Sequence, residues 1–141
     1  MMDFTKKLLK KLAKEITGKL KLTFMGNLLD FSKPWKRISI HDTLLEKLGK
    51  DLYELDYDEL VNTARRVGIE YSEPVSLGDI IINIFENLYL SHLIQPTLIY
   101  NFPKNASVIC YDIKMAKDYR DNNLMLEIFE LYLGGMELAN G

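Results

Sequence analysis

Apolar residues recur at every fourth position near the start of the chain, the spacing of one face of a helix. The stripe consists of Phe4, Leu8, Leu12 and Ile16. We predict an amphipathic helix over residues 3–17, ended by Gly18. We expect the stripe to pack on a core and the neighbouring lysines to face solvent. The alternative is a basic helix that contacts RNA or another anionic surface, but Asp3 and Glu15 dilute its charge.

Polar and apolar residues then alternate over residues 19–24, as in a strand with one buried face. Residues 25–27 have turn-forming composition and 28–31 can return as a second strand, so we predict a hairpin. Three helices should follow, because polar capping residues precede three apolar segments. The capping pairs, each three residues apart, are Ser39 with Asp42, Asp56 with Glu59, and Ser76 with Asp79.

The last third of the chain is rich in residues that favour strands. We predict strands at 97–100, 107–113, 127–133 and 136–140, with a turn at Gly134 and Gly135 and a polar loop over 118–123. The alternation in 127–133 predicts a sheet with one buried face. Helices followed by strands indicate the α+β class, with an antiparallel sheet flanked by helices.

The composition of the chain limits the class of protein and the cellular location that we expect for it. Its 141 residues suit one domain or part of one, and 48% apolar with 27% charged residues is ordinary for a globular protein. The net charge of −2 provides no global basic field, so any RNA contact has to be local. A single cysteine, no secretory signal and no stretch of roughly 18 apolar residues favour the cytoplasm over a membrane or secreted location.

Few residues suggest chemistry by themselves. We interpret His41 as a surface residue near a helix start, His92 as a residue favoured at a helix end, and Cys110 as a buried inert thiol. The acidic residues between 51 and 59 should be helix caps and solvated groups. Glu127 and Glu130, three apart on a strand, should point to opposite faces and form no carboxylate pair. No glycine-rich phosphate loop is present.

Glu137 and Asn140 stand apart from this background. They lie three positions apart on the last predicted strand, after the glycine pair, and neither has an obvious structural task. A carboxylate and an amide in this position are candidate functional groups.

Three stretches resemble the class II lysyl-tRNA synthetases, in the order and with the approximate spacing of that family. Residues 29–38 (LDFSKPWKRI) resemble its "DFxxPfxRi" segment, and residues 92–103 (HLIQPTLIYNFP) resemble "HLiQPTFi.dyP". Residues 129–141 (FELYLGGMELANG) resemble "FElfi.GmElaNg". The resemblance covers essentially the whole chain.

The resemblance implies a partial class II catalytic domain over residues 1–141. Residues 1–49 would form a helix, a hairpin and a short helix, 50–95 an inserted helical region, and 96–141 strands of the core. The family activates lysine with ATP and transfers it to tRNA. By resemblance, Glu137 matches the glutamate that holds ATP-bound magnesium, and Asn140 matches the asparagine that lines the amino-acid pocket. No catalytic residue is assigned.

Other parts of the family pattern are absent or changed. The arginine-bearing motif 2 is expected upstream of Met1, and a second acidic segment and motif 3 downstream of Gly141. Residues 105–113 intervene where the family continues directly, and Ile128 replaces a family arginine. We therefore expect an internal fragment that is inactive alone and binds neither ATP nor magnesium alone.

Two alternatives stay open. The first is a fragment of the related ligase that lysylates elongation factor P, which shares the "GmElaNg" ending. The second is a non-enzymatic domain that binds a partner, such as a complementary synthetase fragment, through exposed strand edges. Homodimer formation is a further expectation from the family.

Overall fold

The computed structural model describes residues 1–104, 106 and 125–141. The predicted strand at 107–113, the predicted loop at 118–123 and Cys110 lie outside the described residues. The described elements are α1 (Met2–Thr17), β1 (Lys21–Phe24), β2 (Asn27–Asp30), β3 (Lys36–Ser39), α2 (Ile40–Leu48), η1 (Leu52–Glu54), α3 (Tyr57–Arg66), α4 (Leu77–Tyr89), η2 (Leu90–His92), β4 (Thr97–Pro103), β5 (Met125–Leu133) and β6 (Met136–Asn140). Among these residues, no helix is both long and apolar enough to cross a membrane.

The main sheet has the strand order β3-β4-β5-β6, and β1 and β2 form the separate predicted hairpin. The α+β class is confirmed. However, β3 runs parallel to β4, so the sheet is mixed and not wholly antiparallel as predicted. The segment from α2 to η2 connects these two strands as a crossover, which a parallel pair requires. The β4–β5 and β5–β6 pairs are antiparallel.

The three helix starts follow the predicted capping pairs. The side chains of Ser39, Asp56 and Ser76 each accept a hydrogen bond from the backbone N–H three residues on. At Asp56 the box is complete, because the Glu59 side chain also accepts from the Asp56 backbone N–H. These local bonds fix where α2, α3 and α4 begin.

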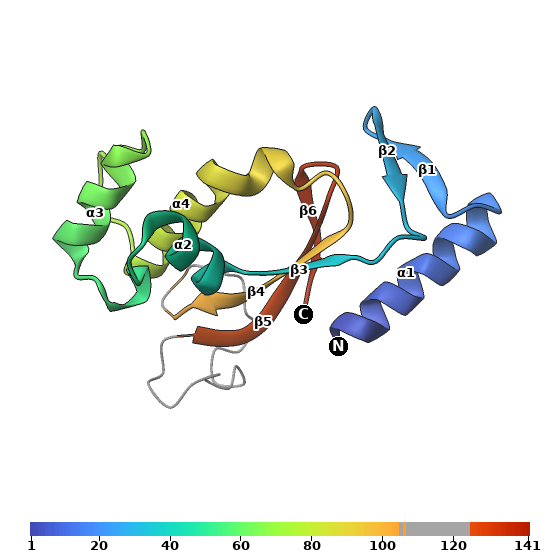
Figure 1. Cartoon of the computed structure of the whole chain (residues 1–141), viewed down its shortest axis with the longest axis horizontal. Coiled ribbons are helices and arrows are strands. Elements are labelled where there is room, and N and C mark those ends of the chain that lie inside the picture. The colour runs from blue at the N-terminus through green and yellow to red at the C-terminus, as the bar shows by residue number, and fades with distance from the viewer. Residues whose placement is uncertain (105, 107–124) are drawn as a thin grey trace.

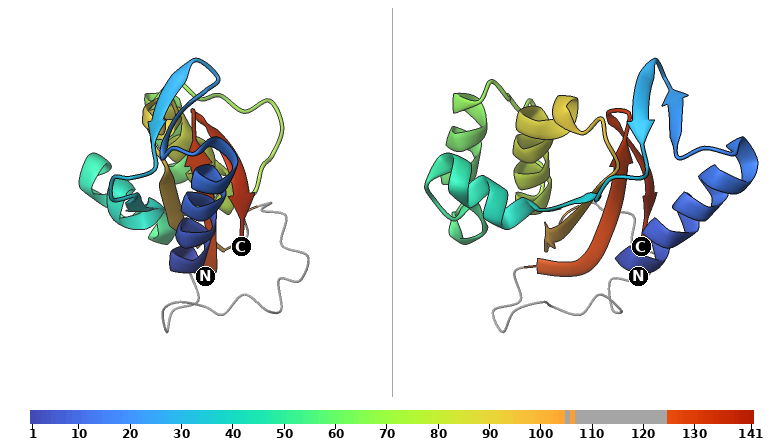
Figure 2. Two further views of the ribbon diagram at one scale, coloured as in Figure 1. Left: turned by 90° about the vertical axis from the view of Figure 1, so that its right-hand side faces the viewer. Right: turned by 45° about the vertical axis from the view of Figure 1, so that its right-hand side comes forward.

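Helices α2, α3 and α4 lie on one side of the main sheet, and α1 with the β1–β2 hairpin lies on the other (Figures 1 and 2). The larger core joins helix residues such as Leu44, Ile80 and Phe85 to Ile99 and Tyr132 of the sheet. A smaller core joins residues of the hairpin region to the opposite face of the sheet: Leu29, Phe31, Trp35, Leu98, Phe129, Leu131 and Leu133. The sheet is therefore covered on both faces.

Because both faces of the sheet are covered, the prediction that β5 buries only one face is wrong. Its residues were expected to bury one face, but Leu126 and Tyr132 belong to the larger core while Phe129 and Leu131 belong to the smaller one. Only Glu127 on this strand is exposed. A strand that is buried on both faces needs apolar residues at nearly every position, and β5 has them.

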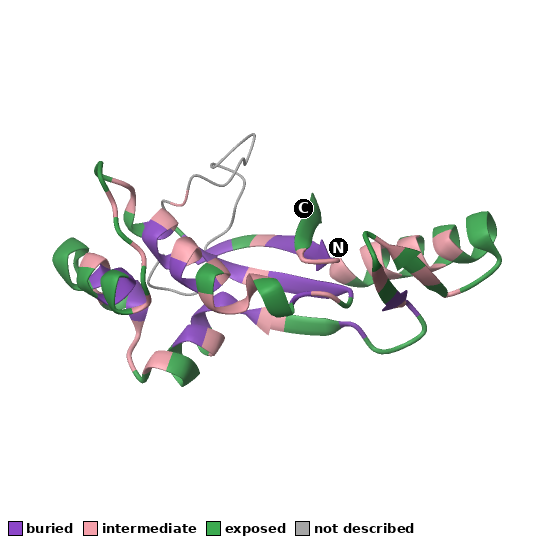
Figure 3. Ribbon diagram, turned by 90° about the horizontal axis from the view of Figure 1, so that it is seen from above, coloured by how far each residue is buried: buried purple, intermediate pink, exposed green. Residues whose placement is uncertain are grey.

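The expected packing of the α1 stripe is also wrong. Phe4, Leu8, Leu12 and Ile16 remain exposed, and α1 has no buried residue (Figure 3). The helix instead contacts the smaller core through Met2 and Leu9, on the side next to the stripe. The periodicity predicted the helix correctly, but it did not predict which side of the helix packs on the core.

Candidate functional site

Glu137 and Asn140 lie on the same face of β6 although they are three residues apart. The register explains this, because Ala139 pairs with Leu131 and Glu137 pairs with Tyr132, which leaves Leu138 as an extra residue. Such a bulge resets the alternation of side chains along a strand. The Asn140 Nδ2 atom donates to Glu137 Oε1 at 3.2 Å. The bulge thus places the two predicted site residues in contact.

The turn before β6 sets the position of this pair. Gly134 and Gly135 both have positive φ angles, 66° and 83°, as a tight hairpin turn requires. A Cβ on Gly134 would lie 3.0 Å from a ring carbon of Phe24, so the space admits only glycine without a shift. The backbone N–H groups of both glycines donate to the carbonyls of Ile94 and Leu93. The turn predicted from the sequence is confirmed and is fixed to the end of η2.

Three further polar side chains gather on β5 and α4 beside Glu137. The Tyr132 hydroxyl lies 3.0 Å from Glu130 Oε2 and 3.4 Å from Glu86 Oε1, and it has one proton to donate between them. Glu130 is only 7% exposed. Tyr132 is the cross-strand partner of Glu137. We call Glu86, Glu130 and Glu137 the carboxylate group.

Burial and neighbouring charges raise the pKa values of Glu130 and Glu86. Burial, followed by the charges of Glu137 and Glu86, raises the pKa of Glu130 to about 7, against the lowering effect of the Tyr132 hydrogen bond. Burial raises the pKa of Glu86 as well, with a contribution from Glu137. Burial also raises the pKa of Tyr132, followed by the charge of Glu130. Glu130 therefore changes its charge close to neutral pH.

Sequence reasoning missed part of this arrangement. Glu130 was considered only with Glu127, and those two do differ as predicted, one buried and one exposed. The Tyr132 hydroxyl contacts both Glu130 and Glu86, and so joins β5 to a helix residue 46 positions away in the chain. No spacing along the chain indicates a contact over that distance. The only available signal was that Glu130 lies in the same family-like segment as Glu137.

The two histidines differ in their surroundings. His92 is exposed at the end of η2, where Ser91 Oγ lies 3.3 Å from its Nδ1. His41 is buried, which contradicts its interpretation as a surface residue. Its two ring nitrogens lie 2.9 Å from Asp42 Oδ1 and 2.8 Å from Asp51 Oδ2. The ring is satisfied by structural contacts and does not join the site at β6.

The acidic residues at 51 and 56 act as caps, as predicted. Asp51 accepts from the Tyr53 backbone N–H at the start of η1, and Asp56 caps α3. Asp51 has the additional contact with His41 that the sequence did not indicate.

Comparison with known proteins decides the family. The model of the family described as tRNA synthetases class II (D, K and N) matches residues 1–141, the whole chain. The chain belongs to this family. It is 34% identical over 141 residues to a lysine–tRNA ligase of Thermoanaerobacter sp. (strain X514), covering 99% of this chain and 27% of that protein.

Other relatives of this class II synthetase chain agree. It is 37% identical over 142 residues to lysine–tRNA ligase 2 of Methanosarcina acetivorans, covering 100% of this chain and 27% of that protein. It is 37% identical over 147 residues to a lysine–tRNA ligase of Pasteurella multocida, covering 100% of this chain and 28% of that protein. The chain thus spans about a quarter of the length of these relatives. The family resemblance seen in its sequence is confirmed.

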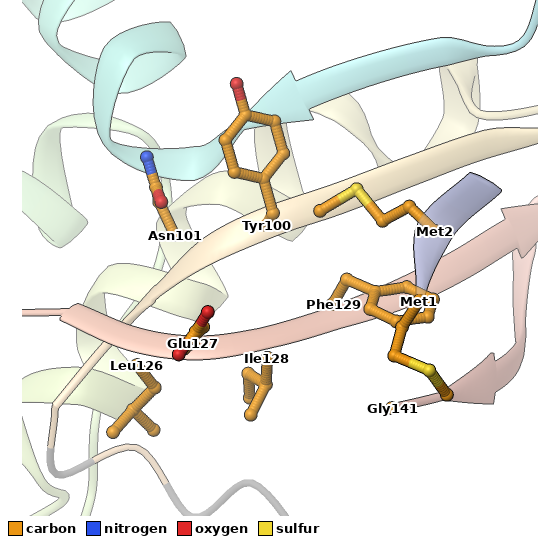
Figure 4. Close-up of a pocket in the computed structure, with 9 residues that line it drawn as sticks. All are labelled: Met1, Met2, Tyr100, Asn101, Leu126, Glu127, Ile128, Phe129 and Gly141. Atoms are coloured by element: carbon orange, nitrogen blue, oxygen red, sulfur yellow. The ribbon is translucent and has the colours of Figure 1, made fainter. Parts of the chain in front are cut away.

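A hollow adjoins the end of β6 in this class II synthetase chain (Figure 4). It has a volume of about 310 Å³ and lies between the first two residues and the sheet. Ile128 and Phe129 contribute apolar surface, while Glu127 and Asn101 contribute polar groups. The position of Ile128 is the one where the family resemblance implies an arginine. A guanidinium at that position would place a charge at this hollow, whereas isoleucine makes it more apolar.

A magnesium ion requires oxygen ligands, which carboxylates, phosphates and water supply. Within residues 1–104, 106 and 125–141, no group of three or more His, Cys, Asp or Glu residues could hold a metal ion. Glu137 offers an exposed carboxylate, with one oxygen accepting from Asn140. Magnesium often takes one or two carboxylates and completes its shell with water and substrate phosphates. Glu137 therefore fits a phosphate-bound magnesium ion but not a metal cage made by the protein.

Proposed function

We propose that this chain forms part of the lysine-activating site of a lysine–tRNA ligase, with Glu137 facing the magnesium of ATP and Asn140 facing lysine. The observation that carries the proposal is the contact between these two residues, at the positions where the family resemblance implies both roles. Family membership over the whole chain supports it. The relatives described above are named lysine–tRNA ligases, which favours the tRNA enzyme over the elongation factor P ligase.

The residues would divide the work by their chemistry. The exposed Glu137 carboxylate would hold the cation, and magnesium, when bound, would offset the negative charge of the ATP phosphates. The Asn140 amide donates to Glu137 and so orients that carboxylate. Its carbonyl oxygen would remain available to accept a hydrogen bond from an amino group of lysine. Tyr132 and Glu130, behind Glu137, would restrict its rotation and repel further carboxylates.

Other parts of the synthetase would make the remaining substrate contacts. One carboxylate and one amide do not orient ATP, lysine and tRNA together, and orientation supplies a large share of rate acceleration. The 141 residues alone should therefore be inactive. We propose the cytoplasm as their compartment, and a homodimer or a complementary synthetase fragment as the partner.

A chimera tests the proposal directly. The matching segment of the Pasteurella multocida ligase would be replaced by these 141 residues, and lysine-dependent ATP–pyrophosphate exchange measured. We expect the chimera to retain exchange and Glu137→Gln to lower it about 100-fold, as loss of a group that stabilises transition-state charge does. Glu54→Gln, an exposed carboxylate on η1, is the matched control and should leave exchange unchanged.

Asn140→Ala in the same chimera separates two roles. A higher KM for lysine with an unchanged KM for ATP would support a contact with the amino acid. A rise in both constants would show that Asn140 acts only through Glu137. Full activity of the Glu137→Gln chimera would overturn the role of Glu137, and exchange by the 141-residue chain alone would overturn the need for other segments.

A further inference from the structure

A second cavity lies over the opposite edge of the sheet from Glu137. It has a volume of about 470 Å³ and is lined by residues of β3, α2, the end of α4, η2 and the start of β4. This volume is within the usual range of ligand pockets. None of Glu86, Glu130 and Glu137 lines the cavity, so it is distinct from the carboxylate group. We call it the β3 pocket.

The β3 pocket combines cationic groups with apolar surface. Lys36 comes from β3, Lys47 from α2 and His92 from η2, and none of the lining residues is acidic. Ile38, Leu88 and Leu93 provide apolar surface between them. The consecutive elements β3 and α2 and the distant η2 thus bring basic side chains around one cavity, in a chain whose net charge is −2.

The two lysines of the pocket differ from other basic residues of the described structure in their ion pairing. Three other basic residues form ion pairs: Lys21 with Asp30, Lys11 with Glu15, and Arg37 with Asp3. Neither Lys36 nor Lys47 has an ion pair with any residue that the structure describes. Both side chains are exposed. Their ammonium groups are therefore available to an anion that enters the cavity.

Tyr89 adds an aromatic ring and a hydroxyl to the lining. Its ring stacks on Phe85 with centroids 5.4 Å apart, which fixes its orientation. Burial, and then the charge of Glu46, raises the pKa of Tyr89, so its hydroxyl stays protonated and can donate. The negative charge of Glu46, near Tyr89, would repel an anion bound on that side of the pocket.

We propose that the β3 pocket binds one nucleotide of an RNA strand, with phosphate oxygens on Lys36 and Lys47 and the base on the apolar and aromatic surface. Cationic groups beside an aromatic platform are the combination that binds single-stranded RNA without strict sequence preference. An acidic peptide would use the lysines but leave the apolar surface of the cavity empty. This site does not depend on the proposed roles of Glu137 and Asn140.

Fluorescence anisotropy with a short labelled oligouridylate RNA and the full 141-residue chain tests the site. Affinity would be measured over a series of potassium chloride concentrations. Each phosphate contact to a single strand contributes about 0.7 to the slope of log K against log salt. The double variant Lys36→Gln/Lys47→Gln should therefore bind more weakly and reduce the magnitude of the slope by about 1.4.

Two other variants make the result specific. Lys7→Gln/Lys14→Gln removes two exposed lysines of α1 that do not line the pocket, and should leave the affinity within about twofold, because salt screens charges that do not contact the ligand. Glu46→Gln should strengthen binding by removing a repulsive charge. Thermal melting of each variant checks that the fold is retained. Equal losses from the pocket and α1 variants, or no loss from the pocket variant, would overturn the proposal.

Three competitors distinguish the ligand class. Unlabelled RNA should displace the labelled strand, while AMP and polyglutamate should do so only weakly. Displacement by AMP at the same concentration as RNA would assign the pocket to free nucleotides and overturn the choice of RNA. Equal displacement by polyglutamate would assign it to acidic protein segments, with the same consequence.

Discussion

His41 Nε2 lies 2.8 Å from Asp51 Oδ2, which joins the first turn of α2 to the start of η1. The His41 ring is 5% exposed and packs edge-on against Tyr53, with centroids 5.0 Å apart. Tyr53 in turn donates to the carbonyl of Asn101 in β4 at 2.6 Å. The His41–Asp51 contact thus belongs to a polar connection from the helices to the sheet.

His41→Leu is expected to lower the free energy of unfolding by about 1–2 kcal/mol, because it removes the contacts of a buried ring with Asp42 and Asp51. The exposure of Asp42 limits the loss, since water can replace the imidazole as its partner. Urea denaturation would measure the change. The control is His92→Leu at an exposed position, which should change stability by less than about 0.5 kcal/mol. Equal effects at both positions would show that the His41 contacts contribute nothing.

The exposed stripe of α1 leads to a second prediction. Leu8→Gln and Leu12→Gln should each change the free energy of unfolding by no more than about 0.5 kcal/mol, because both side chains already face solvent. Leu9→Gln, on the same helix, should cost roughly 1 kcal/mol, since Leu9 packs on the smaller core. Leucine and glutamine have similar helix propensities, so the comparison reports packing. Chemical denaturation of the three variants would check it, and a loss at Leu12 equal to that at Leu9 would contradict it.

Local chemistry made much of the fold predictable. The capping pairs at Ser39, Asp56 and Ser76 involve atoms three residues apart, so the sequence contains both partners side by side. The turn at Gly134 and Gly135 is equally local. These signals place helix starts and turns without any knowledge of the tertiary structure.

Contacts between distant segments were not predictable in the same way. The parallel pairing of β3 with β4 depends on the path of an intervening helical segment. The burial of His41 depends on η1 folding back over α2. At the candidate site, the family resemblance indicated Glu137 and Asn140, but the bulge that brings them together and the approach of Glu86 are tertiary features.

The high pKa of Glu130 predicts a pH-dependent stability. Its pKa is about 7 in the fold and 4.5 ordinarily, so the folded state binds the proton more tightly. The resulting stabilisation is complete below pH 4.5 and is lost as pH rises through about 7. Glu130→Gln keeps a neutral side chain, so it should exceed the wild type at pH 8 by up to about 3 kcal/mol and match it near pH 4.

Urea denaturation of both proteins across this pH range isolates the effect, because the other titrating groups are common to both. Glu127→Gln, at the exposed position of the same strand, is the matched control for the substitution itself. A difference between Glu130→Gln and the wild type that stays constant with pH would show that Glu130 does not titrate near neutrality.

Gln95 connects the hairpin to the main sheet through both ends of its side-chain amide. Its Oε1 accepts from the Asp30 backbone N–H at 3.0 Å, and its Nε2 donates to the Leu28 carbonyl at 2.8 Å. The side chain thus occupies the place of a further strand at the edge of β2. Gln95→Ala should lower the free energy of unfolding by about 1–2 kcal/mol for two lost hydrogen bonds.

The larger effect of Gln95→Ala should be local. Hydrogen exchange at the Asp30 amide should become faster, while exchange within β4 and β5 should keep its protection. Gln95→Glu is the informative companion, because a carboxylate can still accept from Asp30 but cannot donate to Leu28. It should therefore retain protection at Asp30 while losing stability. Unchanged exchange at Asp30 in Gln95→Ala would mean that packing of Leu29 and Phe31 alone holds the hairpin to the sheet.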